Sequence, residues 1–272
     1  MEDRIRVSLC QLSVVSDKAE NLRKAATMVT QAANEGAKIA VLPEMFNCPY
    51  QSELFPKYAE VYPEGETISL LAQLAKSKSI AIVGGSIPER DGDKVYNTSF
   101  IFNNKGLLVG RHRKAHLFDV DIKGGTVFKE SDTLTAGDDV TVVEQDGLVF
   151  GVGICYDIRF AEMARIMTDK GAKLLIYPAA FGTVTGPAHW ELLMRARAVD
   201  NQVFVIGAAP GQTLGAQYQA YGHSIAVDPW GRVLSQATEH EVMVTVELNL
   251  GLVDKVREEL PILKHRRQEI YQ

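Results

Sequence analysis

Short apolar runs alternate along the chain with longer amphipathic segments, a pattern typical of an α/β protein. The apolar runs predict strands at residues 5–12, 39–42, 80–84, 95–102, 107–110, 141–144, 148–154, 174–178, 203–208, 224–227, 232–235 and 242–248. Apolar residues at helical spacing predict helices at residues 21–35, 67–78, 161–167, 187–201 and 251–259. Thr67 is the expected N-cap of the second helix. Residues 124–139 show no clear period and are expected to form a structured loop.

The second half of the chain repeats the order of elements in the first half. A strand ends in Pro43 in one half and in Pro178 in the other, and the hairpin over residues 100–109 has a counterpart over residues 224–235. Two similar halves that each mix strands and helices predict two sheets packed face to face with helices outside. No linker or low-complexity segment interrupts this order, so residues 1–272 are expected to form a single domain.

Composition narrows the class of protein. The chain of 272 residues is 46% hydrophobic and 23% charged, which is enough for one sizeable core. Its net charge of −5 argues against a general nucleic-acid or membrane-surface binder. No apolar run approaches membrane-spanning length, and no apolar signal region opens the chain. We therefore expect a cytoplasmic protein that binds neither nucleic acid nor membrane.

One cysteine lies where chemistry can be expected. Cys10, Cys48 and Cys155 are too scattered for a disulfide framework, and no Cys/His spacing predicts a metal site. Cys155 lies at the turn between a predicted strand and a predicted helix, where backbone N–H groups stabilise a thiolate and an adjacent oxyanion. Cys155 is thus a candidate nucleophile, with a buried structural cysteine as the alternative.

Two charged residues also follow strand ends, where α/β folds place substrate-binding side chains. Glu44 follows the second strand, and Lys114 follows the first hairpin. A carboxylate in a dry cleft can accept a thiol proton, and a fixed ammonium can stabilise a thiolate and an oxyanion. Each residue taken singly could instead be a solvated surface charge. His116 and His189 are rival candidates for the base.

Together with the segments around them, these residues resemble the nitrilase superfamily of carbon–nitrogen hydrolases over essentially the full length of the chain. The matching segments are residues 42–44, 113–118, 153–160, 185–193, 195–201 and 222–224. The resemblance implies a four-layer αββα sandwich, a homodimer or higher homo-oligomer, and no metal or organic cofactor. It also implies a Glu–Lys–Cys triad at Glu44, Lys114 and Cys155, with Glu130 supporting the lysine and orienting the substrate.

Within the superfamily, residues 47–50, 84–89, 116–119 and 155–157 resemble the omega-amidase branch. True nitrilases usually have Trp-Glu after the cysteine and carbamoyl-amine hydrolases often have Trp-Asp, whereas this chain has Tyr156-Asp157. The resemblance implies hydrolysis of a small carboxamide, with the terminal amide of a 2-oxo dicarboxylic acid, such as 2-oxoglutaramate or 2-oxosuccinamate, as the expected substrate. Deaminated glutathione, N-carbamoyl amines and simple aliphatic amides are alternative substrates. A Cys–His thiol hydrolase and a non-catalytic interaction module are more distant alternatives.

The expected reaction passes through a thioester. Glu44 takes the proton of Cys155, the sulfur attacks the amide carbon, and Lys114 holds the oxyanion together with the backbone N–H of Tyr156. Glu44 then protonates the leaving ammonia and activates the water that releases the acid.

A substrate with a carboxylate at its far end needs a further cation. Arg111 and Arg113 gather near the site in sequence, and Arg159, four residues after the nucleophile, is the best candidate. Arg159 could instead pair with Glu162 or Asp157 and only brace the turn. The hydroxyl of Tyr50 is a second candidate donor to the carboxylate, and Tyr156 and His189 complete the expected substrate-binding set.

Overall fold

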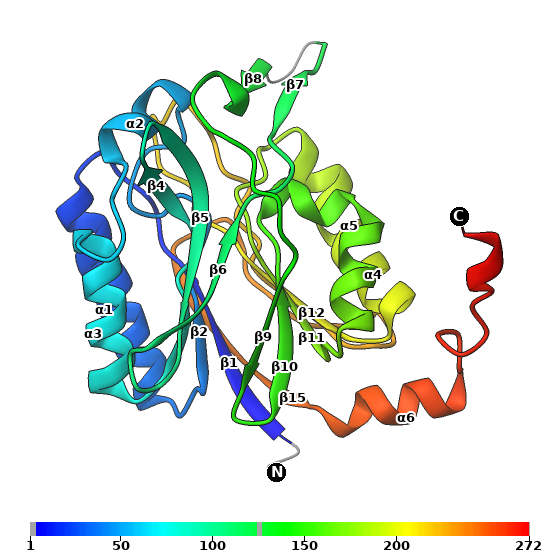
Figure 1. The fold of residues 1–272 in the computed structure, drawn as a ribbon. Helices are drawn as coiled ribbons and strands as arrows, with labels where there is room; N and C mark the ends of the chain where they lie inside the picture. Colours follow the sequence, from blue (N-terminus) through cyan, green and yellow to red (C-terminus); the bar gives the residue numbers. More distant parts are fainter. Residues whose placement is uncertain (1–3, 124–126, 272) are drawn as a thin grey trace.

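The computed structural model describes residues 4–123 and 127–271, and it has four layers (Figure 1). Two sheets pack face to face, and helices cover both outer faces. Helices α1 (Lys18–Asn34) and α3 (Glu66–Lys78) cover the first sheet. Helices α4 (Ala161–Asp169) and α5 (Thr185–Asn201) cover the second sheet. The αββα sandwich predicted from the sequence is therefore confirmed.

The two sheets share one pattern of strand pairing. The first sheet has the order β15 (Val242–Asn249), β1 (Arg4–Gln11), β2 (Ile39–Val41), β3 (Ala81–Val83), β5 (Lys94–Phe102) and β4 (Ile87–Asp91), with β6 (Leu108–Arg113) also paired to β5. The second has the order β14 (Val233–Gln236), β13 (Ile225–Val227), β12 (Phe204–Ala208), β11 (Leu174–Pro178), β10 (Leu148–Val152) and β9 (Thr141–Gln145). In each sheet three parallel central strands are flanked by antiparallel ones. This agreement matches the two similar halves of the sequence.

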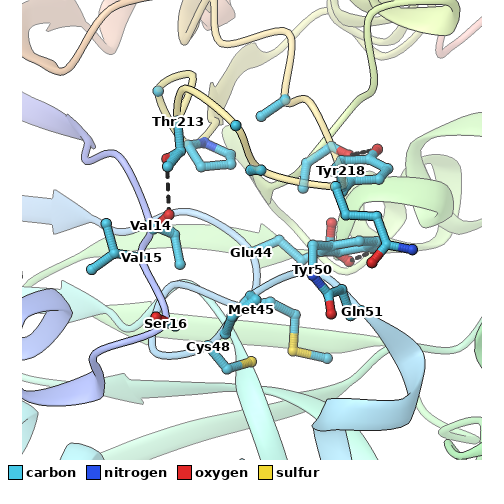
Figure 2. Close-up of a pocket in the computed structure, with 18 of the residues that line it drawn as sticks. Val14, Val15, Ser16, Glu44, Met45, Cys48, Tyr50, Gln51, Thr213 and Tyr218 are labelled. Atoms are coloured by element: carbon cyan, nitrogen blue, oxygen red, sulfur yellow. Dashed lines mark hydrogen bonds between the residues drawn. The ribbon is translucent and has the colours of Figure 1, made fainter.

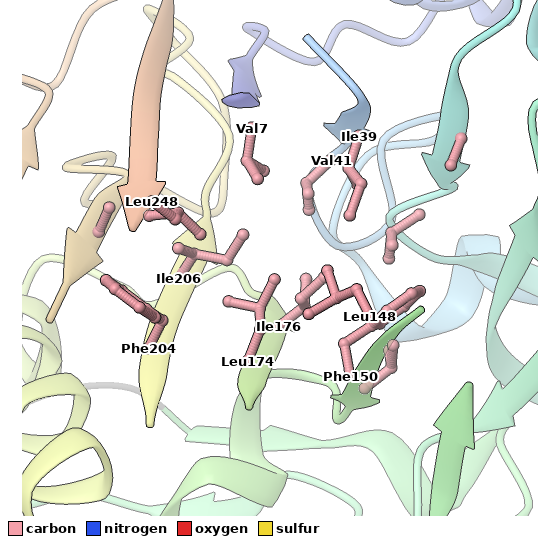
Figure 3. Close-up of a cluster of buried hydrophobic side chains, with 14 of the residues drawn as sticks. Val7, Ile39, Val41, Leu148, Phe150, Leu174, Ile176, Phe204, Ile206 and Leu248 are labelled. Carbon is pink, nitrogen blue, oxygen red and sulfur yellow. The ribbon is translucent and has the colours of Figure 1, made fainter. Parts of the chain in front are cut away.

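The hydrophobic core lies between the sheets (Figure 3). Val7 and Val41 of the first sheet face Phe150, Ile176 and Ile206 of the second, and all five are buried. Side chains on a strand alternate between its two faces, so the intervening residues of the same central strands pack on the helices. Strands buried on both faces explain the short, almost wholly apolar runs in the sequence.

The start of α3 differs from the prediction. The N-cap is Gly65, not Thr67, and Gly65 makes no side-chain cap hydrogen bond. The carboxylate of Glu60 accepts hydrogen bonds from Thr67 N at 2.8 Å and from Ile68 N at 3.4 Å, and it also pairs with Lys18. A helix start leaves N–H groups without partners and favours an anion. Here a residue outside the helix supplies that anion, which the local capping rule cannot foresee.

The loop predicted over residues 124–139 is partly regular. Residues 124–126 lie outside the described residues, and β8 (Val127–Lys129) pairs with β7 (Asp119–Asp121) as a small separate sheet. The 3-10 turn η2 (Glu130–Asp132) follows. The aromatic segment before α3 holds η1 (Ser52–Leu54) and α2 (Phe55–Tyr58), and the chain ends in α6 (Gly251–Glu259) and η4 (Gln268–Ile270). None of the helices in the described residues combines the length and the apolar composition that a membrane-spanning helix requires.

Candidate active site

Glu44 is carried by a tight turn directly after β2. Met45 has a positive φ of 50°, and its backbone N–H donates to Ser86 Oγ at 3.1 Å. The Ser86 N–H in turn donates to the Pro43 carbonyl oxygen at 3.1 Å. These contacts fix the direction in which Glu44 leaves the sheet, so its side chain points into the buried site rather than to solvent.

Gly85 packs against this turn, and we expect Gly85→Ala to disturb it. A Cβ at Gly85 would lie 2.1 Å from the Pro43 carbonyl oxygen, and Gly85 has a φ of +55°. Gly92→Ala is the matched control, because Gly92 has a φ of +58° and nothing lies within 4 Å of its Cβ position. Both variants suffer the left-handed strain, but only Gly85→Ala adds a clash, expected at about 1–3 kcal/mol.

Urea unfolding and turnover test this pair of variants. Gly85→Ala should lower the free energy of unfolding further than Gly92→Ala and should lose activity, whereas Gly92→Ala should keep wild-type turnover. Equal losses in the two variants would show that the turn at Glu44 tolerates the added methyl group.

Lys114 reaches the site because of the alternation along β6. His112 and Lys114 point to the interior and are fully buried. Arg111 and Arg113 point to the other side, where both bind Glu89, at 3.0 Å and 2.8 Å. Arg111 and Arg113 are near the site in sequence but do not reach it in space, since a strand cannot present consecutive residues on one face.

Cys155 follows the end of β10 and begins the 3-10 turn η3 (Cys155–Arg159). Its φ of +44° lies in the left-handed region, which costs a residue with a side chain about 1–3 kcal/mol and is typical of functional sites. The N–H of Tyr156 is among the groups that the start of such a turn leaves without an intrahelical partner. The turn thus places the thiol beside the Tyr156 N–H, for which no backbone partner occurs among the described residues.

The structure brings Glu44, Lys114 and Glu130 into one buried cluster. Lys114 Nζ lies 2.8 Å from Glu44 Oε1 and 2.9 Å from Glu130 Oε1. Asn97 Nδ2 also donates to Glu44 Oε1 at 2.9 Å, and the side chains of Lys114 and both glutamates are 0% exposed. Glu44 Oε2 accepts no hydrogen bond within normal distance from the described residues. One oxygen of Glu44 is therefore held in place while the other stays available.

Electrostatics in the cluster suit a base beside a cation. Burial raises the pKa of Glu44, and the charge of Glu130 raises it further against the opposing effect of Lys114. Burial alone would lower the pKa of Lys114, but the charges of Glu130 and Glu44 hold that pKa well above its ordinary value. Burial, then the charge of Glu44, raises the pKa of the Cys155 thiol. The resting site therefore holds a neutral thiol, a charged ammonium and a carboxylate of increased basicity.

Glu130 begins the turn η2 after β8, and its position could not be found from local sequence. Its Oε2 accepts a hydrogen bond from the Phe118 N–H at 2.7 Å, so the strand pair β7–β8 fixes the carboxylate. Asn97 was also missed. The run Asn97-Thr98-Ser99 within an otherwise apolar strand was the available signal, since polar side chains buried in a central strand need partners.

Tyr50 occupies a different place from the one predicted. Its hydroxyl donates to Glu130 Oε1 at 3.0 Å and lies 3.4 Å from Glu44 Oε1. The hydroxyl has a single proton, and the two glutamates take it, so Tyr50 is not free to bind a substrate carboxylate. It instead holds the two glutamates in place.

The other predicted substrate residues lie around Cys155. A narrow hollow of about 10 Å³ is lined by Phe118, Cys155, Tyr156, Arg159, Ala180, Phe181, Thr185 and Tyr218. Arg159 Nη1 lies 3.3 Å from His189 Nδ1, and the guanidinium sits 5.1 Å from the ring centre of Phe181. Arg159 Nε is buried and has no partner among the described residues, and no described ion pair joins Arg159 to Glu162 or Asp157. The alternative that Arg159 pairs with Glu162 or Asp157 and only braces the turn is therefore not supported by the geometry.

Neither rival histidine contacts the thiol among the described hydrogen bonds. His116 Nδ1 binds Asp157 Oδ1 at 2.8 Å, and the His116 ring stacks on Phe160. His189 is exposed on α5 and contacts Arg159. Glu44, by contrast, is close enough to Cys155 for its charge to raise the pKa of the thiol.

A larger pocket of about 450 Å³ opens beside Glu44 and Tyr50 (Figure 2). Its walls come from residues 14–16, 44–51 and 210–220, and Thr213 Oγ1 donates to the Val14 carbonyl oxygen at 2.8 Å along one side. Tyr218 borders both this pocket and the hollow at Cys155. The segment 211–220, predicted to shape a pocket edge, does so. No group of three or more His, Cys, Asp or Glu residues suited to a metal ion occurs in the described part of the chain.

Comparison with known proteins agrees with this geometry. The profile of the family described as carbon-nitrogen hydrolase matches residues 6–258. The chain is 49% identical to the omega-amidase NIT2 of Danio rerio over 98% of this chain and 96% of that one. It is 48% identical to the omega-amidase NIT2 of Xenopus tropicalis over 98% and 97%. The crystal structure of Saccharomyces cerevisiae Nit3, a member of branch 10 of the nitrilase superfamily, superposes with a TM-score of 0.90 at 45% identity, covering 97% of both chains. The chain belongs to the carbon–nitrogen hydrolase family.

Proposed function

We propose that this protein is an omega-amidase that hydrolyses the terminal amide of a small 2-oxo dicarboxylic acid monoamide, such as 2-oxoglutaramate, to the acid and ammonia. The observation that supports it most is the buried Glu44–Lys114–Glu130 cluster next to Cys155. A binding module has no need to bury three charged side chains and a strained cysteine together, because burying charge is costly unless the groups are used or paired. The names of the relatives at 46–49% identity support the same substrate class.

Each step follows from a position in the cluster. Glu44 takes the thiol proton, and the Cys155 sulfur bonds to the amide carbon while the carbonyl electron pair moves to oxygen. Lys114 and the Tyr156 N–H stabilise that oxyanion. Glu44 then gives its proton to the departing nitrogen, which leaves as ammonia, and the thioester remains. Glu44 next takes a proton from water, whose oxygen bonds to the thioester carbon. The carbon–sulfur bond then breaks, the acid leaves, and Glu44 returns its proton to the Cys155 sulfur. Glu130 and Tyr50 hold Lys114 and Glu44 in place throughout.

Arg159 is proposed to bind the carboxylate at the far end of the substrate. It lines the hollow at Cys155, and its buried Nε has no described partner. A guanidinium binds a carboxylate through two parallel hydrogen bonds, which an ammonium cannot reproduce. His189, 3.3 Å from Arg159, helps to orient it.

We expect Arg159→Met to raise KM for 2-oxoglutaramate about 10- to 100-fold and to leave kcat/KM for uncharged butyramide nearly unchanged. The KM of Arg159→Lys for 2-oxoglutaramate should lie between those of the wild type and Arg159→Met, because the positive charge stays but the bidentate geometry is lost. Ammonia release with both amides measures this. Equal kcat/KM values for the two amides in the wild type would contradict the proposed carboxylate-binding site at Arg159. A higher kcat/KM for an N-carbamoyl amine would indicate a different substrate class.

A homodimer through the α4–α5 face is also proposed. Exposed apolar side chains occur on this outer layer, at Ile166, Leu192 and Val199, and at Trp230 on the adjoining turn. By contrast, no large hydrophobic side chain is exposed on the described helices α1 and α3. An apolar patch of this kind on one face suits a two-fold contact with a second copy. The single domain and the cytoplasmic location stay predictions.

Leu192→Asp should convert the dimer to a monomer. Leu192 is 64% exposed, so the substitution does not disturb the core, but it would bury an unpaired charge on each subunit in the proposed contact. Val61→Asp, at a side chain that is 50% exposed outside this face, is the control. Light scattering after size exclusion would reject the proposed face if Leu192→Asp stayed dimeric.

A further inference from the structure

A buried carboxylate beneath the active site joins two segments that are distant in sequence. Asp157, on the turn η3, is fully buried. Its Oδ2 accepts from Ile154 N at 2.8 Å and lies 3.0 Å from His112 Nε2. Its Oδ1 accepts from His116 N at 3.0 Å and lies 2.8 Å from His116 Nδ1. An ionised carboxylate only accepts, so both histidine nitrogens carry a hydrogen there.

The partners of Asp157 lie close in sequence to one of the two proposed reacting residues, and Asp157 lies close to the other. His112 and His116 flank Lys114, and Asp157 lies two residues after Cys155. The three hydrogen bonds from His112 and His116 therefore connect the segment that carries the ammonium to the turn that carries the thiol, and the fourth, from Ile154, lies within that turn. Asp157 itself lines neither the pocket beside Glu44 nor the hollow at Cys155. It does not reach a substrate, so any effect on the reaction must act through other residues.

We propose that Asp157 is a positioning residue, which with His112 and His116 sets the placement of Lys114 relative to Cys155. The proposal rests on the function proposed above in taking Cys155 and Lys114 as the reacting pair. A misplacement of about 1 Å can cost a reaction about 100-fold, and a carboxylate with four donors is a rigid anchor. Because Asp157 holds this turn but lines neither cavity, it acts on the chemistry through geometry and not by contact with the substrate.

Burial of the group agrees with this role. Burial alone would raise the pKa of Asp157, but the hydrogen bonds from His112 and His116 hold it well below its ordinary range. Removing one hydrogen-bond donor leaves the Asp157 carboxylate with fewer partners, so its position becomes less restricted while the protein stays folded. His116 allows a mild perturbation, since its side chain is 33% exposed and its backbone N–H can still donate to Asp157 after any substitution except proline.

Two substitutions of His116 separate its two contacts. His116→Phe keeps a flat ring to stack on Phe160 but removes the donor to Asp157. His116→Asn removes the stacking ring but can place an amide N–H where Nδ1 was. We expect His116→Phe to lower kcat about tenfold with KM within twofold of the wild type, and His116→Asn to restore most of kcat. His240→Phe, at an exposed histidine, should behave as the wild type.

Alkylation of Cys155 by iodoacetamide, followed by intact mass, gives a readout independent of any substrate. Cys10 and Cys48 are 0% exposed, so a single modification reports Cys155. The alkylation rate should fall in His116→Phe in parallel with kcat and recover in His116→Asn, with thermal unfolding midpoints alike. Equal turnover and alkylation in His116→Phe and the wild type would overturn the proposal, and so would a defect in His116→Asn as large as in His116→Phe. A wild type inactive on every omega-amide would reject the proposed function, while alkylation would still test the role of Asp157.

Discussion

Cys155→Ala should abolish ammonia release, by at least about 1,000-fold, because no other group can form the thioester. The substitution removes only the sulfur from a residue whose backbone is already held at a φ of +44° by the surrounding turn. Secondary structure by circular dichroism should therefore be unchanged. When the wild type is mixed with substrate and the reaction is quenched, intact mass should show the added mass of the acyl group. The variant should show no such increase.

The other two cysteines are the internal controls. Cys10 and Cys48 are fully buried, and burial raises the pKa of each thiol, to about 12 for Cys10. Neither therefore supplies a thiolate at neutral pH. Cys10→Ala and Cys48→Ala should each lose about 1 kcal/mol of stability through a small cavity and keep turnover. Substantial activity in Cys155→Ala, or its loss in Cys10→Ala, would show that the nucleophile has been wrongly assigned.

Glu44→Gln should fold normally and lose turnover by about 100- to 10,000-fold, the usual contribution of a general base. Glu44 Oε1 accepts hydrogen bonds from Lys114 and Asn97, and a glutamine oxygen in that place can accept them too. The second oxygen, which has no hydrogen bond within normal distance among the described residues, is replaced by an amide that cannot take a proton. Intact mass should show no thioester in this variant, since acylation itself needs the base.

Glu130→Gln is the matched control for charge. It also removes one of the two carboxylates on Lys114, at a distance of 2.9 Å against 2.8 Å for Glu44. We expect it to slow turnover less and still to accumulate thioester. Equal defects in the two variants, with no thioester in either, would assign the loss to the charge around Lys114 rather than to proton transfer. His116→Asn and His189→Asn should both keep measurable activity, and their inactivity beside an active Glu44→Gln would favour a Cys–His mechanism.

The pH dependence of the wild type provides a further check on Glu44. Its carboxyl must be ionised to accept the thiol proton, and burial raises its pKa above the ordinary value of 4.5. Activity is therefore lost as pH falls through the raised pKa. The acid limb of kcat/KM should lie above pH 4.5 and should be missing from the residual activity of Glu44→Gln.

The pattern of the chain alone predicts the layers and singles out Glu44, Lys114 and Cys155 as candidate reacting side chains. Strand and helix periods are local properties, so apolar runs and amphipathic segments located most elements to within a few residues. Glu44, Lys114 and Cys155 each lie within three residues of the end of a strand, and strand ends are where an α/β fold places its chemistry. The resemblance to the carbon–nitrogen hydrolases then assigned their roles and added Glu130.

Which polar groups share the site depends on how distant segments meet in space. Glu44 and Glu130 are far apart in the sequence, yet both bind the ammonium of Lys114. The pairing of β7 with β8 brings Glu130 to this position. The alternation along β6 separates Arg111 and Arg113 from Lys114, and the tyrosine expected to bind substrate, Tyr50, is used by the two glutamates. A hydrogen bond depends on distance in space, and a buried charge must find a partner wherever the fold supplies one. Local sequence contains the hydrophobic period of each strand, but it does not contain the hydrogen-bond partner that each buried polar side chain meets in the folded protein.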